Sequence, residues 1–153
     1  QLMGYPTRMT RTTDTSIHTK GDTIAAQKMS DLKERVRIVN DSERQILVSI
    51  HQNFFSDQRY SGAQVFHAND EQSKKLARLL QRSFADTVNP GSRRQEKKAE
   101  GIYLMEHITQ PGILVECGFL SNPQEEARLS DPEYQKKLCC VMASTLSLFL
   151  HTE

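Results

Sequence analysis

The segment 111–123 constrains the fold more than any other stretch of this 153-residue chain. Its apolar residues 113–115 lead without alternation into Glu116, which predicts a buried strand that carries a carboxylate near its carboxyl end. Asn122 and Pro123 then supply the N-cap and the first position of a helix. A strand that continues directly into a helix is a unit of α/β folds, so we expect this class.

A second apolar run, residues 46–50, ends at His51. Because both runs lack the alternation of a half-solvated strand, we expect both to be central strands covered on both faces. Sites in open α/β sheets form at the carboxyl ends of the strands, so His51 and Glu116 are candidates for one shared site. Two simpler interpretations remain: Glu116 as a core carboxylate paired with Lys or Arg, and His51 as a hydrogen-bonded structural residue.

The rest of the chain has the pattern of a single domain with helices on both faces of a sheet. Further strands are predicted at 5–11, 63–67 and 102–105, and further helices beginning near Ser30, Asp70 and Asp131. The basic run 92–98 is predicted to be a solvated loop or, alternatively, a contact for an anionic substrate. Residues 1–4 resemble the end of a helix, with Gly4 just after it, so we expect the sequence to begin inside a domain.

Charge and cysteine content exclude several classes of protein. The 20 Lys and Arg residues against 19 Asp and Glu give a net charge of +1, which argues against a general nucleic-acid or membrane-surface binder. No apolar stretch is long enough for a membrane span. The three cysteines form no disulfide or zinc-finger pattern and are predicted to be free thiols. Cys117 is a poor nucleophile candidate, because its apolar run raises a thiol pKa and it lies on the strand face opposite Glu116.

The candidate pair suits metal-assisted hydrolysis best. The chain has no G-x-S-x-G elbow, P-loop, G-x-G-x-x-G or H-E-x-x-H motif. A hydrolytic zinc typically has three protein ligands and a water, and a nearby carboxylate takes the proton of that water. His51 fits the ligand and Glu116 the base, but two residues do not make a zinc site.

Two motifs resemble those of a known family. Residues 48–53 (V-S-I-H-Q-N) and 114–123 (L-V-E-C-G-F-L-S-N-P) are similar to the S-I-H-x-N and V-E-x-G-F-x-S-N motifs of the zinc-dependent N-acetylmuramoyl-L-alanine amidases, the amidase-3 family. Arg35 and Asn40 before the His51 run fit the same pattern. Within the family, residues 30–33 and Tyr103 most resemble the spore germination-specific (CwlD-type) amidases.

The resemblance implies a mixed, twisted sheet flanked by helices, and hydrolysis of the amide between N-acetylmuramic acid and L-alanine in peptidoglycan. His51 then corresponds to a Zn²⁺ ligand of the family and Glu116 to its catalytic base. The family's other two zinc ligands have no counterpart here. We therefore expect residues 1–153 to be one amidase-like domain that lacks its first strand and most of its first helix, and to be inactive alone.

Further expectations follow from the same resemblance. Asn53 is predicted to line the pocket, Arg93 or its neighbour Arg94 to meet substrate carboxylates, and His18 is a weak substitute ligand. The substrate is a muramyl peptide of the cell wall or spore cortex, which implies an extracytoplasmic location, a role in sporulation or germination, and possible activation by a protein partner. The alternatives are a non-catalytic amidase-like module that binds peptidoglycan or a partner, and a zinc peptidase or deacylase that cleaves a different bond.

Overall fold

A mixed four-stranded sheet forms the centre of the molecule. The computed structural model describes residues 4–152, and its strands are β1 (Leu47–Asn53), β2 (Gln64–His67), β3 (Lys97–Lys98) and β4 (Gly112–Phe119). Their order in the sheet is β1-β4-β2-β3. β1 runs parallel to β4, β2 runs antiparallel to β4, and β3 runs parallel to β2. The mixed sheet expected from the sequence is thereby confirmed.

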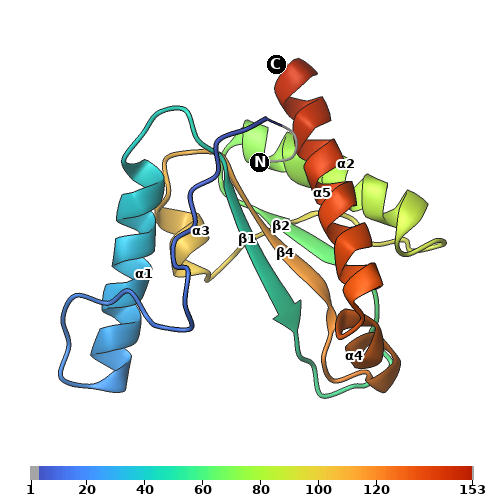
Figure 1. Cartoon of the computed structure of the whole chain (residues 1–153), viewed down its shortest axis with the longest axis horizontal. Coiled ribbons are helices and arrows are strands. Elements are labelled where there is room, and N and C mark those ends of the chain that lie inside the picture. Colours follow the sequence, from blue (N-terminus) through green and yellow to red (C-terminus); the bar gives the residue numbers. More distant parts are fainter. Residues whose placement is uncertain (1–3, 153) are drawn as a thin grey trace.

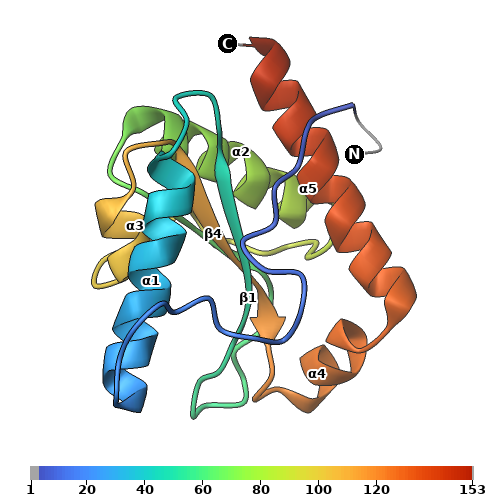
Figure 2. The same cartoon turned by 60° about the vertical axis from the view of Figure 1, so that its left-hand side comes forward.

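Helices cover both faces of this sheet (Figure 1). They are α1 (Ile24–Asn40), α2 (Glu71–Thr87), α3 (Tyr103–His107), α4 (Pro123–Leu129) and α5 (Pro132–Thr152). Figure 2 shows α1 and α3 together on one side of the sheet, with α5 on the other side, where α2 also packs. The short helix α4 follows β4 at the end of the sheet where β1 and β4 finish.

β4 is the strand that both layers bury. Ile113 and Val115 are inaccessible to solvent within the cluster that α2 and α5 build, and Leu114 packs into the smaller cluster beside α3. A strand covered on both faces has a continuous apolar sequence, and the prediction of such a strand is confirmed for β4. β1 differs, because Ile50 is 59% exposed and β1 is one of the two edge strands within residues 4–152. The prediction of a central strand was therefore wrong for β1.

Residues 5–11 form no strand, contrary to the sequence prediction. The segment runs from α5 to α1, and its side chains form hydrogen-bond contacts with side chains of these helices instead of pairing with a strand. The Tyr5 hydroxyl lies 3.3 Å from Ser147 Oγ, and Arg35 donates a 3.0 Å hydrogen bond to Thr10 Oγ1. A local apolar pattern does not by itself make a strand, and no strand of residues 4–152 pairs with this segment.

Two further expectations about local structure were wrong. Residues 102–105 form no strand: Ile102 is the N-cap of α3 and the other three residues lie in this helix, in which Leu104 and Met105 are buried. α1 begins earlier than predicted, with Thr23 as its N-cap. Ser30 is buried inside α1, where its hydroxyl accepts a 3.0 Å hydrogen bond from the Thr19 backbone N–H. Ser30 thus fastens the preceding loop to α1 instead of beginning the helix.

The start of α4 matches the sequence prediction. The Asn122 side chain accepts hydrogen bonds from two backbone N–H groups of the first turn, and Pro123 occupies the first helical position. Glu125, on the same turn, is buried and accepts hydrogen bonds from the backbone N–H groups of Gly62, at 2.7 Å, and Phe119, at 3.3 Å. One carboxylate therefore holds together the end of β4, the start of α4 and the loop between β1 and β2.

Candidate active site

His51 and Glu116 lie opposite each other on neighbouring strands. They are Cα partners in the register of the parallel pair β1 and β4. Paired residues on adjacent strands project from the same face of a sheet, and adjacent strands lie about 4.8 Å apart. The structure thus places the imidazole and the carboxylate, 65 positions apart in the chain, on neighbouring strands and on the same face of the sheet.

Glu116 has a buried and unsatisfied carboxylate oxygen. Its Oε2 is inaccessible to solvent and has no hydrogen-bond partner within residues 4–152. Burial raises the pKa of Glu116 above the usual range of a glutamate. The alternative of a core carboxylate paired with Lys or Arg does not fit, because the described part of the chain offers Glu116 no ion pair. An unpartnered buried carboxylate oxygen indicates a site that completes itself with a ligand or water.

The surroundings of His51 favour the neutral form of its imidazole. Its Nε2 lies 2.8 Å from Ser49 Oγ on the same strand. Burial, and after it the positive charge of Arg35, lowers the pKa of His51. Arg35 is fixed on α1 by Asp31, whose Oδ2 accepts a 2.6 Å hydrogen bond from Arg35 Nε. A neutral imidazole at pH 7 can act as a metal ligand or accept a proton in a hydrogen bond.

The two predicted substrate contacts occupy different surroundings. Asn53 ends β1, where its backbone oxygen accepts a 2.8 Å hydrogen bond from the Leu120 N–H and its side-chain oxygen one from the Phe54 N–H. It therefore lies at the same end of the sheet as Glu116. Arg93 is exposed and makes no hydrogen bond or ion pair within residues 4–152. The roles of Asn53 and Arg93 remain predictions.

Within residues 4–152 the other candidate groups do not complete a metal site with His51 and Glu116. His18 is exposed, and its Nδ1 lies 2.9 Å from Ser16 Oγ. Over residues 4–152 no three His, Cys, Asp or Glu side chains gather as a metal site would require. Cys117 packs into the core on the α2 and α5 side, and burial raises its pKa to about 11. The prediction that this thiol lies opposite Glu116 is confirmed, and it is not a nucleophile at neutral pH.

Comparison with known proteins gives a consistent result. A sequence profile described as N-acetylmuramoyl-L-alanine amidase matches residues 1–146. The germination-specific N-acetylmuramoyl-L-alanine amidase of Bacillus subtilis is 39% identical over 144 residues, which cover 90% of this chain and 59% of the relative. This chain thus spans about three fifths of that relative's length. None of the helices in residues 4–152 combines the length and the apolar character that a membrane span needs.

Solved structures agree with the sequence relatives. The CwlD amidase from Clostridioides difficile, solved in complex with the GerS lipoprotein, matches with a TM-score of 0.88 and 33% identity over 94% of this chain and 75% of that chain. An N-acetylmuramoyl-L-alanine amidase from Clostridium difficile 630 matches with a TM-score of 0.72 and 28% identity over 80% of this chain and 66% of that chain. The folds are therefore shared over most of the described residues.

Proposed function

Since the chain belongs to the N-acetylmuramoyl-L-alanine amidase family, amidase-3, we propose that its protein hydrolyses the amide between N-acetylmuramic acid and L-alanine in peptidoglycan. The observation that carries this proposal is the pairing of His51 with Glu116 across β1 and β4, together with the buried and unbonded Oε2 of Glu116. The pairing supplies one imidazole and one carboxylate at the same point of the sheet.

Glu116 is proposed as the general base. Its Oε2 removes a proton from a water molecule while the water oxygen attacks the carbonyl carbon of the amide. The protonated carboxyl then returns this proton to the nitrogen of L-alanine as the carbon–nitrogen bond breaks. The raised pKa of Glu116 suits both steps, because a base that holds its proton more strongly also becomes a useful acid near neutral pH.

Zinc is the proposed cofactor of the whole protein, with His51 as one ligand. When bound, a hydrolytic zinc polarises a carbonyl and makes its water more acidic. The described residues do not hold the metal by themselves, because they bring one imidazole to the site and a hydrolytic zinc uses about three protein ligands. No step above therefore depends on the metal, and the proposed roles of His51 and Glu116 rest on their own geometry.

The relatives also suggest where the protein acts and with what. The Bacillus subtilis relative is named as germination-specific, and the Clostridioides difficile relative forms a complex with a lipoprotein. We propose that this protein works outside the cytoplasm on muramyl peptides of the cell wall or spore cortex, and that a protein partner binds and activates it. Sporulation and germination are the processes that this assignment predicts.

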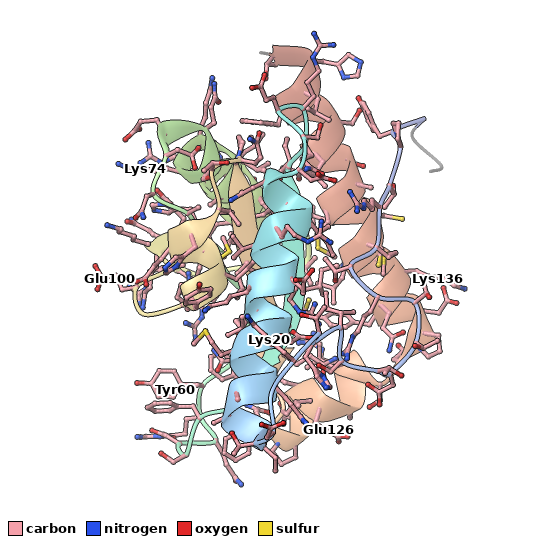
Figure 3. All side chains as sticks on the ribbon, turned by 90° about the vertical axis from the view of Figure 1, so that its left-hand side faces the viewer. Lys20, Tyr60, Lys74, Glu100, Glu126 and Lys136 are labelled. Atoms are coloured by element: carbon pink, nitrogen blue, oxygen red, sulfur yellow. The ribbon has the colours of Figure 1, made fainter. Side chains whose placement is uncertain are left out.

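The variant Glu116→Gln in the natural full-length protein tests the proposed base. We expect turnover of a muramyl peptide to fall at least about 1,000-fold, because the amide keeps the shape of the side chain but accepts no proton. Mass spectrometry of the products measures the release of a peptide with a free L-alanine amino group. Glu100→Gln is the matched control, since Glu100 is exposed and Figure 3 shows it away from α4, which marks the end of the sheet near the site.

Metal analysis of the same variants distinguishes loss of the catalytic base from loss of zinc. Zinc content should be equal in the wild type and in Glu116→Gln. Loss of zinc together with activity counts against Glu116 as the base. Cleavage of a bond other than the muramyl-alanine amide would instead favour a different zinc peptidase or deacylase.

A second candidate function is a non-catalytic module that binds peptidoglycan or a partner protein. It is favoured by the single imidazole that residues 4–152 bring to the site. The two candidates differ in one measurement on the natural full-length product, because the amidase contains about one zinc per chain and the binding module contains none.

A further inference from the structure

Arg94 is held rigidly beside the candidate active site. Its Nε donates a 3.0 Å hydrogen bond to the Ser61 backbone oxygen, and its Nη1 lies 3.4 Å from Gln64 Oε1. The guanidinium also lies over the ring of Phe119, 5.2 Å from the ring centre. A cation above an aromatic face is attracted by the ring, so three separate contacts fix the orientation of this side chain.

The positive charge of Arg94 is left without a carboxylate partner. Arg94 is partly buried, yet within residues 4–152 it forms no ion pair. Arg35, which is also partly buried, pairs with Asp31 on the same helix. A guanidinium carries five N–H donors in a planar fork, and the contacts above use only part of that fork. The remaining donors can bind an anion from outside the chain.

Both side chains that touch Arg94 within the sheet are neighbours of Glu116. Gln64 on β2 is the Cα partner of Glu116 across the antiparallel pair of β2 and β4. Phe119 follows Glu116 by three residues on β4. Directly opposed residues have Cβ atoms about 5 Å apart. Arg94 therefore lies on the rim of the site, one side chain away from the proposed base.

Hydrogen bonds hold the loop that carries Ser61, so the Arg94 guanidinium has its position before a ligand binds. The Asn122 amide donates hydrogen bonds to the backbone oxygens of Gln58, at 2.9 Å, and Tyr60, at 3.3 Å. The Tyr60 ring packs against Phe119 with 6.0 Å between centres. Figure 3 shows Tyr60 at the lower end of the molecule, the same end as Glu126 of α4. A preorganised fork loses little freedom when it binds a carboxylate.

We propose that Arg94 binds a free carboxylate in the peptide part of the substrate and so selects acidic over amidated muramyl peptides. The inference rests on the proposed hydrolysis of muramyl peptides and adds a specificity determinant to the same site. Planar fork geometry matches a carboxylate through two parallel N–H···O bonds, which an amide cannot accept equally. The assignment gives this contact to Arg94 rather than to Arg93, whose side chain is exposed and unrestrained.

Two substrates test the inference in the natural full-length, zinc-loaded protein. One is a muramyl peptide whose second residue carries a free carboxylate, and the other is the same compound with that carboxylate converted to a carboxamide. Arg94→Gln should raise KM for the acid about tenfold, leave kcat within about twofold, and leave KM for the amide unchanged. Arg94→Lys should recover part of the lost discrimination, because it keeps the charge but not the fork.

Two other arginine variants locate the effect. Arg82→Gln, an exposed change on α2, should leave the ratio of KM values for the two substrates at the wild-type level. Arg93→Gln should also leave this ratio of KM values at the wild-type level. If Arg93→Gln abolishes the discrimination between acid and amide while Arg94→Gln does not, the assignment to Arg94 is overturned. An equal rise of KM for acid and amide in Arg94→Gln would show that Arg94 only shapes the site, and would also overturn the inference.

Equilibrium binding keeps this test separate from the proposed hydrolysis. Calorimetry on Glu116→Gln, which binds without turnover, should show the acid binding about tenfold more tightly than the amide, and this preference should vanish when Arg94→Gln is added. A protein that hydrolyses neither compound but keeps that Arg94-dependent preference would refute the proposed reaction and support the inference. Turnover without any preference between acid and amide would support the proposed reaction and refute the inference about Arg94.

Discussion

At the scale of single residues, the two facing groups of the candidate site are both shifted towards their neutral forms. Burial raises the pKa of Glu116, and burial together with Arg35 lowers the pKa of His51. Each shift has a consequence for stability, because a group that is harder to charge in the folded state favours the fold only while it is neutral. Stability gained from neutral Glu116 is complete below the pKa of an unfolded glutamate and is lost as the pH rises through the folded pKa. Stability gained from neutral His51 is present above the pKa of an unfolded histidine and is lost as the pH falls through the folded pKa.

The variant Glu116→Gln should therefore stabilise the zinc-free protein at neutral pH. The ionised carboxylate is buried in part and lacks a partner for Oε2, whereas glutamine carries no charge to desolvate. We expect the thermal midpoint at pH 7, measured with a chelator present, to rise on the order of 3 °C. The advantage should shrink as the pH falls and disappear near about pH 4, where the wild-type carboxyl is protonated as well. A variant that is equally destabilised at both pH values would show that Glu116 has an attractive partner in the folded state.

At the scale of elements, the buried carboxylate of Glu125 connects three parts of the chain, and the Asn122 side chain adds further hydrogen bonds between α4 and the loop after β1. It accepts the N–H groups of Gly62 and Phe119, and it lies in the first turn of α4. A Cβ at Gly118 would lie 2.8 Å from Glu125 Oε2, so a larger residue at this position would push the carboxylate away from its place. Since Phe119 supports both Tyr60 and Arg94, the same carboxylate determines the position of the site's rim.

Glu125→Ala should destabilise the protein by about 2 kcal/mol, because it leaves two backbone N–H groups without their acceptor. Chemical denaturation followed by circular dichroism measures this change. Glu126→Ala is the matched control, since Glu126 is the next residue of α4 and is exposed, and its cost should stay within about 0.5 kcal/mol. Equal costs for the two variants would mean that the contacts of Glu125 contribute nothing beyond its place in the first turn.

The elements also show which sequence signals were sufficient. α2 and α5 were predictable because their apolar residues recur at helical spacing and face one cluster, and α4 because Asn122 and Pro123 mark its start. Residues 5–11 and 102–105 were predicted wrongly because short apolar segments suit a strand or a helix turn equally, and the neighbours that decide between them are far away in the chain. The edge position of β1 could not be predicted either, because the order of strands in a sheet depends on segments that are far apart in the chain.

At the scale of the whole molecule, the sequence was informative about the centre of the site and less so about its rim. His51 and Glu116 each follow an apolar run, and two parallel strands place their carboxyl ends side by side, so their meeting was predictable. Arg94 belongs to a basic run in which sequence does not distinguish one arginine from the next. Its contacts with Ser61, Gln64 and Phe119 depend on how a loop, β2 and β4 come together.

The zinc content of the whole protein provides the last prediction, because the described residues supply only part of a ligand set. If His51 is a ligand, His51→Ala in the natural full-length product should weaken zinc binding at least about 100-fold, more than the loss of a typical supporting contact. His67→Ala is the matched control, because the His67 Nδ1 lies 2.7 Å from the Ala68 backbone oxygen and its strand position pairs with Ile113, at the far end of β4 from Glu116. Competition with a chromophoric chelator measures both affinities.

Thermal unfolding provides a second measurement. A ligand that binds only the folded state stabilises it, so removal of zinc should lower the thermal midpoint of the wild type and of His67→Ala but leave the thermal midpoint of His51→Ala unchanged. Full zinc affinity in His51→Ala would remove the imidazole from the metal site and leave Glu116 as the only proposed catalytic group in this chain.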